Sequence, residues 1–364
     1  MEMMKRLEGD VLEAISDLAG PQDDLTWLSS QTVDPKQFLG LEKNTRAAAI
    51  AELVIWLGFL QWHFRTREGA PSETILHDFK NIRHQDAVLT WDGDPIPQVV
   101  AGPNGTRVET LPNARRPDWP EAEYIVGNPP FLGGKDIRAA LGHLYTETLW
   151  RVHGDINDSA DFVRYWWDRA AEIVAKDGVT RRFGFVTTNH ITQTFSRRTV
   201  ARHLEAKKPV SLLMAISDHP WTRATEKHAA VRIAMTVATA GRHEGVLREV
   251  VSEAALDTDE PKIELSARFG RINADLSVGA DVTTAEALQA NDGISSPGVK
   301  PHGSGFIVTP QEAEALGLGK RPGLERHIRP YRNGRDLTAI PRGVMVIDLD
   351  GLTSDEARQR FPEV

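Results

Sequence analysis

The residues whose types and spacing best suit chemistry lie in the segment YIVGNPPF, at positions 124–131. An apolar strand there would end at a rigid corner formed by Asn128, Pro129 and Pro130, followed by the ring of Phe131. Proline fixes φ and has no N–H, so the corner presents carbonyl oxygens and cannot join a β-ladder. The side-chain oxygen of Asn128 adds one more hydrogen-bond acceptor.

Two acceptors beside an aromatic ring are suited to holding an exocyclic amino group on a planar heterocycle. The oxygens would accept from both N–H bonds of the amine, while the ring of Phe131 stacks on the heterocycle. This arrangement keeps the nitrogen lone pair out of conjugation and directs it toward an electrophile. Methyl transfer to adenine N6 requires this, because an aromatic amine is otherwise a poor nucleophile. A plain turn at the end of a strand is the structural alternative.

The elements that would position this corner alternate between strand and helix along the first two-thirds of the chain. Apolar patterns predict helices at 1–18, 46–65 and 162–175, and strands at 37–42, 86–89, 124–126, 182–187, 210–216 and 231–237. This alternation predicts an α/β fold with a mainly parallel sheet. The helix over 46–65 is apolar nearly all round, which predicts burial on most of its faces.

One insertion, residues 92–120, interrupts this alternation and is rich in Pro, Asn and Gly. It predicts a hairpin of Gln98–Ala101 with Thr106–Thr110 around a Gly-Pro-Asn-Gly turn. The remaining histidines and tryptophans look structural: His190, His219 and His228 lack metal-ligand spacing, so no metal site is expected. Trp167 and Trp221 are expected to be core or loop anchors.

Composition excludes several classes of protein. The chain has 51 acidic and 43 basic residues and a net charge of -8, which argues against binding nucleic acid by bulk charge. It has no cysteine, which excludes a disulfide scaffold, a cysteine nucleophile and a cysteine-ligated metal. The N-terminus lacks the apolar core of a signal peptide, and Glu52 interrupts the most apolar stretch, 47–60. We expect a cytoplasmic protein with no membrane association.

The string NPPF after a strand resembles motif IV of the amino-methyltransferases that use S-adenosylmethionine. The wider string IVGNPPFLGGK resembles the MmeI-like DNA adenine-N6 methyltransferases, which occur in fused restriction–modification enzymes and in phage-defence systems of the BREX and DISARM type. Other stretches that resemble this family are QFLGLEKNTRAAAIAELVIWLGFLQWHFR, NIRHQDAVLTWD, GFVTTNHITQTFSRR, GSGFIVTP and RPYRNGRDL. The resemblance implies a Rossmann-like methyltransferase sheet.

The resemblance also implies roles for individual residues. Glu42 resembles the acid that accepts hydrogen bonds from the ribose hydroxyls of S-adenosylmethionine, and Asp86 the acid that binds its adenine amino group; either could instead be a solvated acid. Asn128, also expected to contact the cofactor, and the carbonyl of Pro129 would hold the target amine. Phe131 would stack on an adenine flipped out of double-stranded DNA. No metal or general base is implied.

Two basic stretches are candidates for contacting DNA phosphates. Residues 320–342 contain seven Lys and Arg against two acids, and residues 188–198 resemble a family loop near the target base. Runs of charge are as often solvated surfaces, and phosphate contacts position DNA without reading its sequence. The candidate DNA-contacting residues are Arg197, Arg198, Arg332 and Arg335.

The chain departs from the family pattern at both ends. The glycine-rich turn that follows the family's first strand has no counterpart upstream of Glu42, so the first strand is expected to be missing. We expect a methyltransferase catalytic domain over 1–240, a connecting segment over 241–300, and the start of a target-recognition region over 301–364. A separate chain could supply the missing strand, the recognition domain or a nuclease.

Three functions therefore stay open. The first is an adenine-specific DNA methyltransferase of a restriction–modification or phage-defence system. The second is a catalytically inactive, truncated homologue or an interaction subunit, which the missing glycine-rich turn favours. The third is a methyltransferase that acts on protein glutamine or on RNA, because the same corner would serve any planar amino group.

Overall fold

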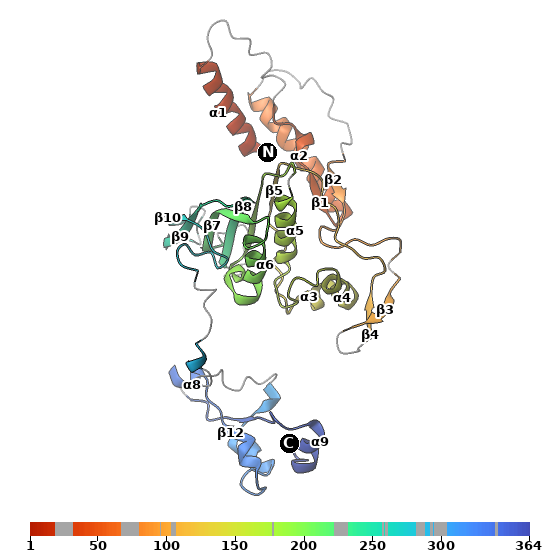
Figure 1. Cartoon of the computed structure of the whole chain (residues 1–364), viewed down its shortest axis with the longest axis vertical. Coiled ribbons are helices and arrows are strands. Elements are labelled where there is room, and N and C mark those ends of the chain that lie inside the picture. The colour runs from red at the N-terminus through yellow and green to blue at the C-terminus, as the bar shows by residue number, and fades with distance from the viewer. Residues whose placement is uncertain are drawn as a thin grey trace. The chain divides into compact units, whose positions relative to one another are not determined.

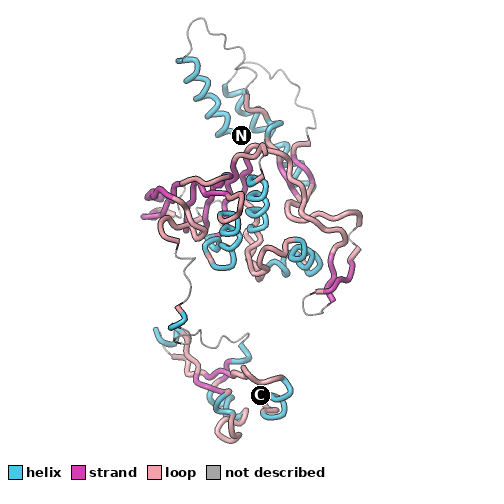
Figure 2. The backbone as a smooth tube through the Cα atoms, in the orientation of Figure 1, coloured by secondary structure: helices cyan, strands magenta, loops and turns pink. Residues whose placement is uncertain are grey.

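The computed structural model describes residues 1–18, 32–66, 80–94, 96–102, 107–176, 178–221, 232–256, 258, 261–281, 288–291, 294, 304–338 and 341–364. They form two compact units, residues 1–284 and residues 285–364, which are described separately below (Figures 1 and 2). The division falls within residues 241–300, for which the sequence predicts a connecting segment.

The first unit is built on a six-stranded sheet in the order β10-β9-β7-β8-β6-β5. Its strands are β5 (Tyr124–Gly127), β6 (Arg182–Thr188), β7 (Val210–Pro220), β8 (Arg232–Ala240), β9 (Gly245–Ala254) and β10 (Lys262–Gly270). The pairs β5–β6 and β7–β9 are parallel, whereas β6–β8, β7–β8 and β9–β10 are antiparallel.

The expectation of a mainly parallel sheet is therefore wrong for these six strands. Parallel neighbours that follow one another need a crossover, usually a helix, whereas antiparallel neighbours can be joined directly. From β7 to β10 the described residues contain no helix, and most of these strands pair antiparallel. Strands β9 and β10 lie in the segment for which the sequence predicts only a connection.

Two helices, α5 (Val163–Ala175) and α6 (Thr194–Leu204), lie beside this sheet (Figure 1). Buried residues of α5 recur at three- and four-residue spacings, which directs one face into the core. Trp167 is fully buried, meets the ring of Phe183 edge-on at 5.2 Å, and donates from Nε1 to Thr236 Oγ1 at 3.2 Å. This confirms Trp167 as a core residue.

A second core forms around the short helices α3 (Ile137–Leu141) and α4 (His143–Val152). It includes Leu149 and Tyr165, both fully buried. The strand pairing of the predicted hairpin is confirmed, since β3 (Gln98–Ala101) pairs antiparallel with β4 (Arg107–Thr110); most of its predicted turn lies within residues 103–106, which are outside the described residues. The hairpin is fastened to α4, because Leu111 N–H donates to Thr148 Oγ1 at 2.8 Å.

The N-terminal part of the first unit holds a separate two-stranded sheet. Strand β1 (Gly40–Glu42) pairs parallel with β2 (Ile82–His84), and a short 3₁₀ helix, η2 (Pro35–Gln37), precedes β1. The strand predicted over 86–89 is thus displaced, because those four residues form a loop after β2. Asp86 Oδ1 accepts from the N–H groups of Val88 and Leu89, which turns the backbone away from a ladder.

Helix α2 (Thr45–Thr66) packs on this small sheet, and α1 (Glu2–Leu18) packs on α2. The prediction that the second of these helices is buried on most faces is wrong for the described residues. Ala48 is its one buried residue, and the side chains of Leu53 and Val54 are each 57% exposed. By length and composition α2 could cross a membrane, and only 6% of its most apolar stretch is buried. A single such helix is weak support for a membrane protein.

The second unit has a three-stranded antiparallel sheet in the order β11-β13-β12. Its core includes Leu324, Ile328 and Phe361. Its elements are β11 (Ile307–Val308), β12 (Ile328–Pro330), β13 (Met345–Ile347), α7 (Pro310–Ala315), α8 (Gly334–Thr338), α9 (Ser354–Arg360) and the 3₁₀ helices η6 (Gln289–Asn291), η7 (Ser304–Phe306) and η8 (Leu324–Arg326).

A buried acid ties α5 to α6 in the first unit. The carboxylate of Asp168 is 1% exposed and is paired with Arg202, with His203 at 2.6 Å and with Arg116 at 3.3 Å. Asp155 and Glu172 gather at the same place, and Arg116 bonds to both of them. The guanidinium of Arg116 is therefore paired with all three carboxylates, those of Asp155, Asp168 and Glu172.

We expect Asp168→Asn to lower the free energy of unfolding by about 3 kcal/mol at pH 7, because it breaks a buried ion pair. Burial alone would raise the pKa of Asp168, but the hydrogen bond from His203 and the charge of Arg202 outweigh it and lower the pKa. The stabilisation is therefore complete above about pH 4 and is lost as pH falls through the lowered pKa. Urea unfolding at pH 7 and below pH 4 measures both effects.

The matched control is Asp118→Asn. Its carboxylate also meets an arginine, Arg169 at 3.3 Å, but is fully exposed, so we expect a change of less than about 1 kcal/mol. Equal destabilisation by the two variants, or a loss for Asp168→Asn that does not depend on pH, would contradict the assignment.

Candidate functional site

The carboxyl ends of three strands of the large sheet meet at one edge. Gly127, the last residue of β5, is opposite Phe185 of the parallel strand β6. At the end of β6, Thr188 is opposite Ile233 of β8, which is in turn opposite His219 of β7. The residues that follow β5, β6 and β7 are thus neighbours, although they are far apart in the sequence.

The predicted corner follows β5 directly. Asn128 and Pro130 are exposed, Pro129 is buried and Phe131 is half-buried. A Cβ on Gly127, just before the corner, would lie 3.1 Å from the ring of Phe185, so a larger residue there would require this ring to shift. In the described part of the chain the amide of Asn128 has no protein partner, so its oxygen is free to accept from a ligand.

An aromatic residue that the sequence did not assign to the site lies against the corner. The ring of Trp221 meets that of Phe131 edge-on, with centroids 5.9 Å apart and planes at 80°. Trp221 is 41% exposed and comes directly after β7. The expectation of a loop anchor is therefore incomplete: Trp221 also forms an aromatic pair with the corner. Its place after the strand at 210–216 was the available signal.

The corner is held from behind by the segment that leads into α5. Leu132 O accepts from Phe162 N–H at 2.8 Å. A Cβ on Gly134 would lie 2.5 Å from the carbonyl oxygen of Ser159, so no other residue fits there. The loop after the corner therefore packs backbone to backbone against residues 159–162, which fixes its position.

The end of β6 is anchored by two acids. Asp161, which is buried, accepts from Thr188 Oγ1 and lies 3.4 Å from His190 Nδ1. Asp218 accepts from the amide of Asn189 at 2.9 Å and from Arg232 Nε at 3.0 Å. The 3₁₀ helix η4 (Asn189–Thr192) is thereby held beside the corner. His190 and His219 make no metal cluster in the described residues, and His228 lies outside them.

The two predicted cofactor acids lie together on the small sheet. Glu42 ends β1 and is half-buried, and one of its carboxylate oxygens accepts from Asn44 N–H at 2.8 Å. Asp86 follows β2; its Oδ2 accepts from the hydroxyl of Tyr145 at 2.9 Å and lies 3.3 Å from Lys43 Nζ. Among the residues that the structure describes, the other oxygen of Glu42 has no partner and is free for a ligand, whereas Asp86 already has a full set of partners.

A family model described as "MmeI, DNA-methyltransferase domain" matches residues 1–248, more than half of the chain. The chain belongs to this family. It is 22% identical over 230 residues to DNA methyltransferase A of Bacillus subtilis (strain 168), covering 63% of this chain and 23% of that protein. It also resembles a solved structure of the type IIL restriction-modification enzyme MmeI in complex with DNA, with a TM-score of 0.42, 23% identity and coverage of 65% and 31%. The chain thus spans less than a third of either relative.

The MmeI-family match covers both predicted acids, the corner and the arginines of α6. Arg197 is half-buried and Arg198 is exposed, with its guanidinium 5.4 Å from the ring centroid of Phe195. Neither has an acidic partner in the described part of the chain. Arg202 on the same helix is instead paired with Asp155 and Asp168. Arg197 and Arg198 are thus available to an external anion.

In the second unit a buried acid organises the stretch RPYRNGRDL. Asp336 accepts from Asn333 N–H at 3.0 Å and holds the guanidinium of Arg342 through Nε at 2.9 Å and Nη2 at 2.6 Å. These bonds hold the pKa of Asp336 well below its usual range. Arg332 is exposed, and the side chain of Arg335 lies outside the described residues. The exposed Arg332 therefore lies on a loop whose conformation is stabilised by the hydrogen bonds of Asp336.

We expect Tyr145→Phe to lower the free energy of unfolding by about 1.5 kcal/mol, because Asp86 loses a buried hydrogen bond to its carboxylate. Burial, followed by the charge of Asp86, raises the pKa of Tyr145, so the hydroxyl stays a donor throughout the working range. Urea unfolding measures the change. Tyr124→Phe on β5, which is exposed, makes the same chemical change as a control. Equal losses in the two variants would show that the bond to Asp86 contributes nothing.

Proposed function

We propose that this chain carries the catalytic domain of a DNA methyltransferase that uses S-adenosylmethionine and methylates N6 of an adenine flipped out of double-stranded DNA. The observation that carries the proposal is the corner at Asn128–Phe131. It combines free acceptors with an aromatic pair, at the edge of the sheet where three strands end. Membership of the MmeI methyltransferase family supports the same chemistry.

The chemistry follows from what the corner can accept. The side-chain oxygen of Asn128 and the carbonyl of Pro129 would take the two N–H bonds of the adenine amine. The amine nitrogen is then pyramidal, and its lone pair is free to attack a methyl carbon. The nitrogen loses one proton to water after the transfer, because its pKa collapses once it is alkylated. Alignment and fixed dipoles thus replace a general base.

The residues present fit the cofactor in part. Glu42 at the end of β1, with one carboxylate oxygen that has no partner among the described residues, would hold the ribose hydroxyls. Asp86 would bind the adenine amino group only by exchanging Lys43, whose side chain is 60% exposed and can move. When bound, S-adenosylmethionine supplies the electrophilic methyl group.

Double-stranded DNA would be held by phosphate contacts. Arg197 and Arg198 lie near the start of α6, the helix that follows η4, and Arg332 and Arg335 would add contacts from the second unit. Such contacts fix the position of the duplex, and extrusion is needed because N6 is paired inside it. A role in restriction–modification or phage defence, in the cytoplasm, is part of this proposal.

A separate chain that supplies a further strand is also part of the proposal. Strand β5 lies at the edge of the six-stranded sheet, and the side chain of Val126 is 83% exposed. An unpaired apolar edge strand is a template for pairing with another strand. An inactive homologue is the competing function, and the same open edge favours it.

Transfer of a labelled methyl group from S-adenosylmethionine tests the proposal. Unmethylated duplex DNA, RNA and a glutamine-containing peptide are compared as acceptors, and the product is digested and analysed by mass spectrometry. We expect N6-methyladenine from DNA alone. Label in RNA or peptide, N4-methylcytosine as the product, or no transfer to any acceptor would overturn the proposal.

We expect Asn128→Ala to reduce the rate of methyl transfer about 100-fold or more, because one of the two acceptors for the amine is lost. DNA binding, measured by fluorescence anisotropy, should change little. Gln289→Ala, an exposed amide in the second unit, is the control for loss of a side-chain amide. Parallel losses of rate and DNA affinity would show that Asn128 acts in binding instead.

We expect Trp221→Ala to reduce methyl transfer about tenfold, since stacking of a base on an aromatic ring contributes about 1–3 kcal/mol. Trp221→Phe should keep most of the rate, because a ring remains beside Phe131. Rates are measured on the same duplex DNA at saturating cofactor. Full activity of Trp221→Ala would remove this residue from the base-binding site.

A further inference from the structure

A pocket lies at the edge of the large sheet opposite the corner. Val210 begins β7 and pairs with Ala240 at the end of β8, and the neighbouring residue Thr239 pairs with Arg182 at the start of β6. This edge therefore holds the amino ends of β6 and β7, whereas the corner lies beyond the carboxyl ends of β5 to β7. The pocket is separated from the proposed methyl-transfer site by the length of the strands.

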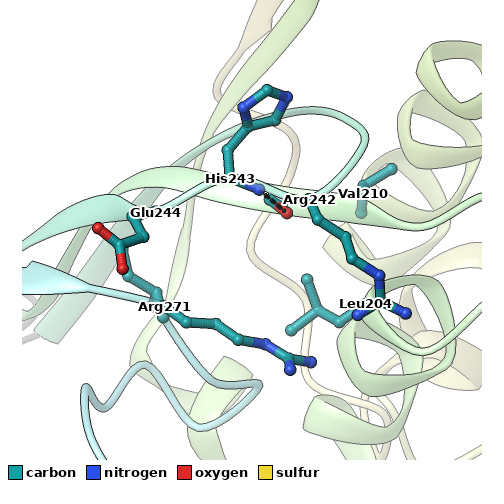
Figure 3. Close-up of a pocket in the computed structure, with 8 residues that line it drawn as sticks. Leu204, Val210, Arg242, His243, Glu244 and Arg271 are labelled. Carbon is teal, nitrogen blue, oxygen red and sulfur yellow. Dashed lines mark hydrogen bonds between the residues drawn. The ribbon is translucent and has the colours of Figure 1, made fainter.

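The pocket has an apolar floor and a basic rim. Its volume is about 280 Å³, and its floor includes Leu204, Val210 and Ile272, all buried. Figure 3 shows the guanidinium groups of Arg242 and Arg271 extending from opposite sides toward Leu204. A small ligand in this pocket would contact a guanidinium group on each side and apolar side chains beneath it.

Both arginines stand on turns that are held rigidly. Ser211 Oγ donates to Gly241 O at 2.7 Å and accepts from His243 N–H at 3.0 Å. Gly241 has a φ of +87°, a conformation that favours glycine, and its N–H donates to Pro209 O at 2.8 Å. The backbone on each side of Arg242 is thereby bonded to the start of β7.

The turn that carries Arg271 is fixed by burial. Ile272 is 2% exposed and bridges to Val278 across a short loop, and Asn273 is buried and accepts from Leu276 N–H through its carbonyl at 3.0 Å. The two guanidinium groups are therefore attached to a preformed frame, and binding a ligand orders only their flexible stems.

Neither arginine has an anionic partner in the part of the chain that the structure describes. This differs from Arg116 and Arg202 of the same unit, which are paired with acids. Glu244 also lines the pocket, but Figure 3 shows its carboxylate turned away from the two guanidinium groups. Two converging positive charges without a counter-charge repel each other, and an anion between them would remove that repulsion.

We propose that this pocket binds a terminal phosphoryl group, either as free phosphate or as the end of a small phosphate monoester. A phosphoryl dianion has three terminal oxygens and two negative charges, so it can accept from both guanidinium forks at once. A carboxylate has two oxygens and one charge. A phosphodiester in a nucleic-acid backbone also has a single charge. The site does not depend on the proposed methyl transfer.

The test is a titration of the whole chain with inorganic phosphate and, separately, with a nucleoside 5′-monophosphate. Ionic strength is held constant with chloride, and the Nε–Hε resonances of Arg242 and Arg271 are followed by NMR. We expect saturable shifts with dissociation constants in the millimolar range or below. Arg242→Gln and Arg271→Gln should each weaken binding about tenfold, the loss expected for one charge-assisted hydrogen-bonded pair. Tighter binding of one ligand identifies the source of the phosphoryl group.

Arg248→Gln is the matched control, because Arg248 is an exposed arginine on β9 that does not line the pocket. All three variants should keep the wild-type melting temperature in chloride. Equal weakening by Arg248→Gln, no saturation by either ligand, or saturable shifts of the Arg242 and Arg271 resonances at lower concentrations of DNA without a terminal phosphate than of either ligand would overturn the proposal. Methyl transfer is not measured, so these outcomes are independent of the catalytic assignment.

Discussion

The parallel pairing of β5 with β6 is the constraint on which the candidate site depends. Gly127 opposite Phe185 brings the backbone of β5 to within van der Waals contact of an aromatic ring. Because the next residues include two prolines, the ladder cannot continue, and the chain must turn out of the sheet at Asn128. The same register places the end of β6, and through β8 the end of β7, at that turn. A shift of one residue would reverse the faces of β5 and separate the acceptors from Trp221.

Helix α5 connects this edge to the interior. Asp161, just before the helix, bonds to the end of β6, and Asp168, two turns later, bonds to α6. Between them Arg164 is fully buried, and this burial lowers its pKa to about 10, with the charge of Asp161 opposing the shift. Its guanidinium therefore stays charged at neutral pH. The nitrogens of the Arg164 guanidinium have no hydrogen-bond partner in the described residues, so the register of α5 is held by Asp161 and Asp168, which a slip would remove from their partners on β6 and α6.

The sequence predicted the local features of the site and missed the features that depend on tertiary contacts. The corner, the strand before it and the hairpin at 98–110 follow from proline chemistry, apolar alternation and turn residues, which act over a few positions. Trp221 was not assigned to the site, because its place after a predicted strand is a weak signal, its partner is 90 positions away, and a single exposed tryptophan has no periodic context. The pairing of β9 and β10 was missed for a related reason: their exposed faces carry charged residues and weaken the apolar signal. The basic residues of 320–342 have different roles that their spacing does not show: Arg342 forms an ion pair with Asp336, whereas Arg332 is exposed.

Helix α2 shows why apolar pattern and burial are separate quantities. A helix that is apolar all round gains about 25 cal/mol of free energy for each Å² of apolar surface that is buried. The pattern alone does not show which residues cover that surface. In the described residues the main contacts of α2 are with α1, η2, β1 and β2, and Leu53 and Val54 stay exposed. The helix begins three residues after Glu42, and Asn44 accepts from its first N–H groups at 3.0 and 3.1 Å. Because the start of α2 follows Glu42 so closely and the helix packs on β1 and β2, the packing of α2 also fixes the position of the proposed cofactor acid.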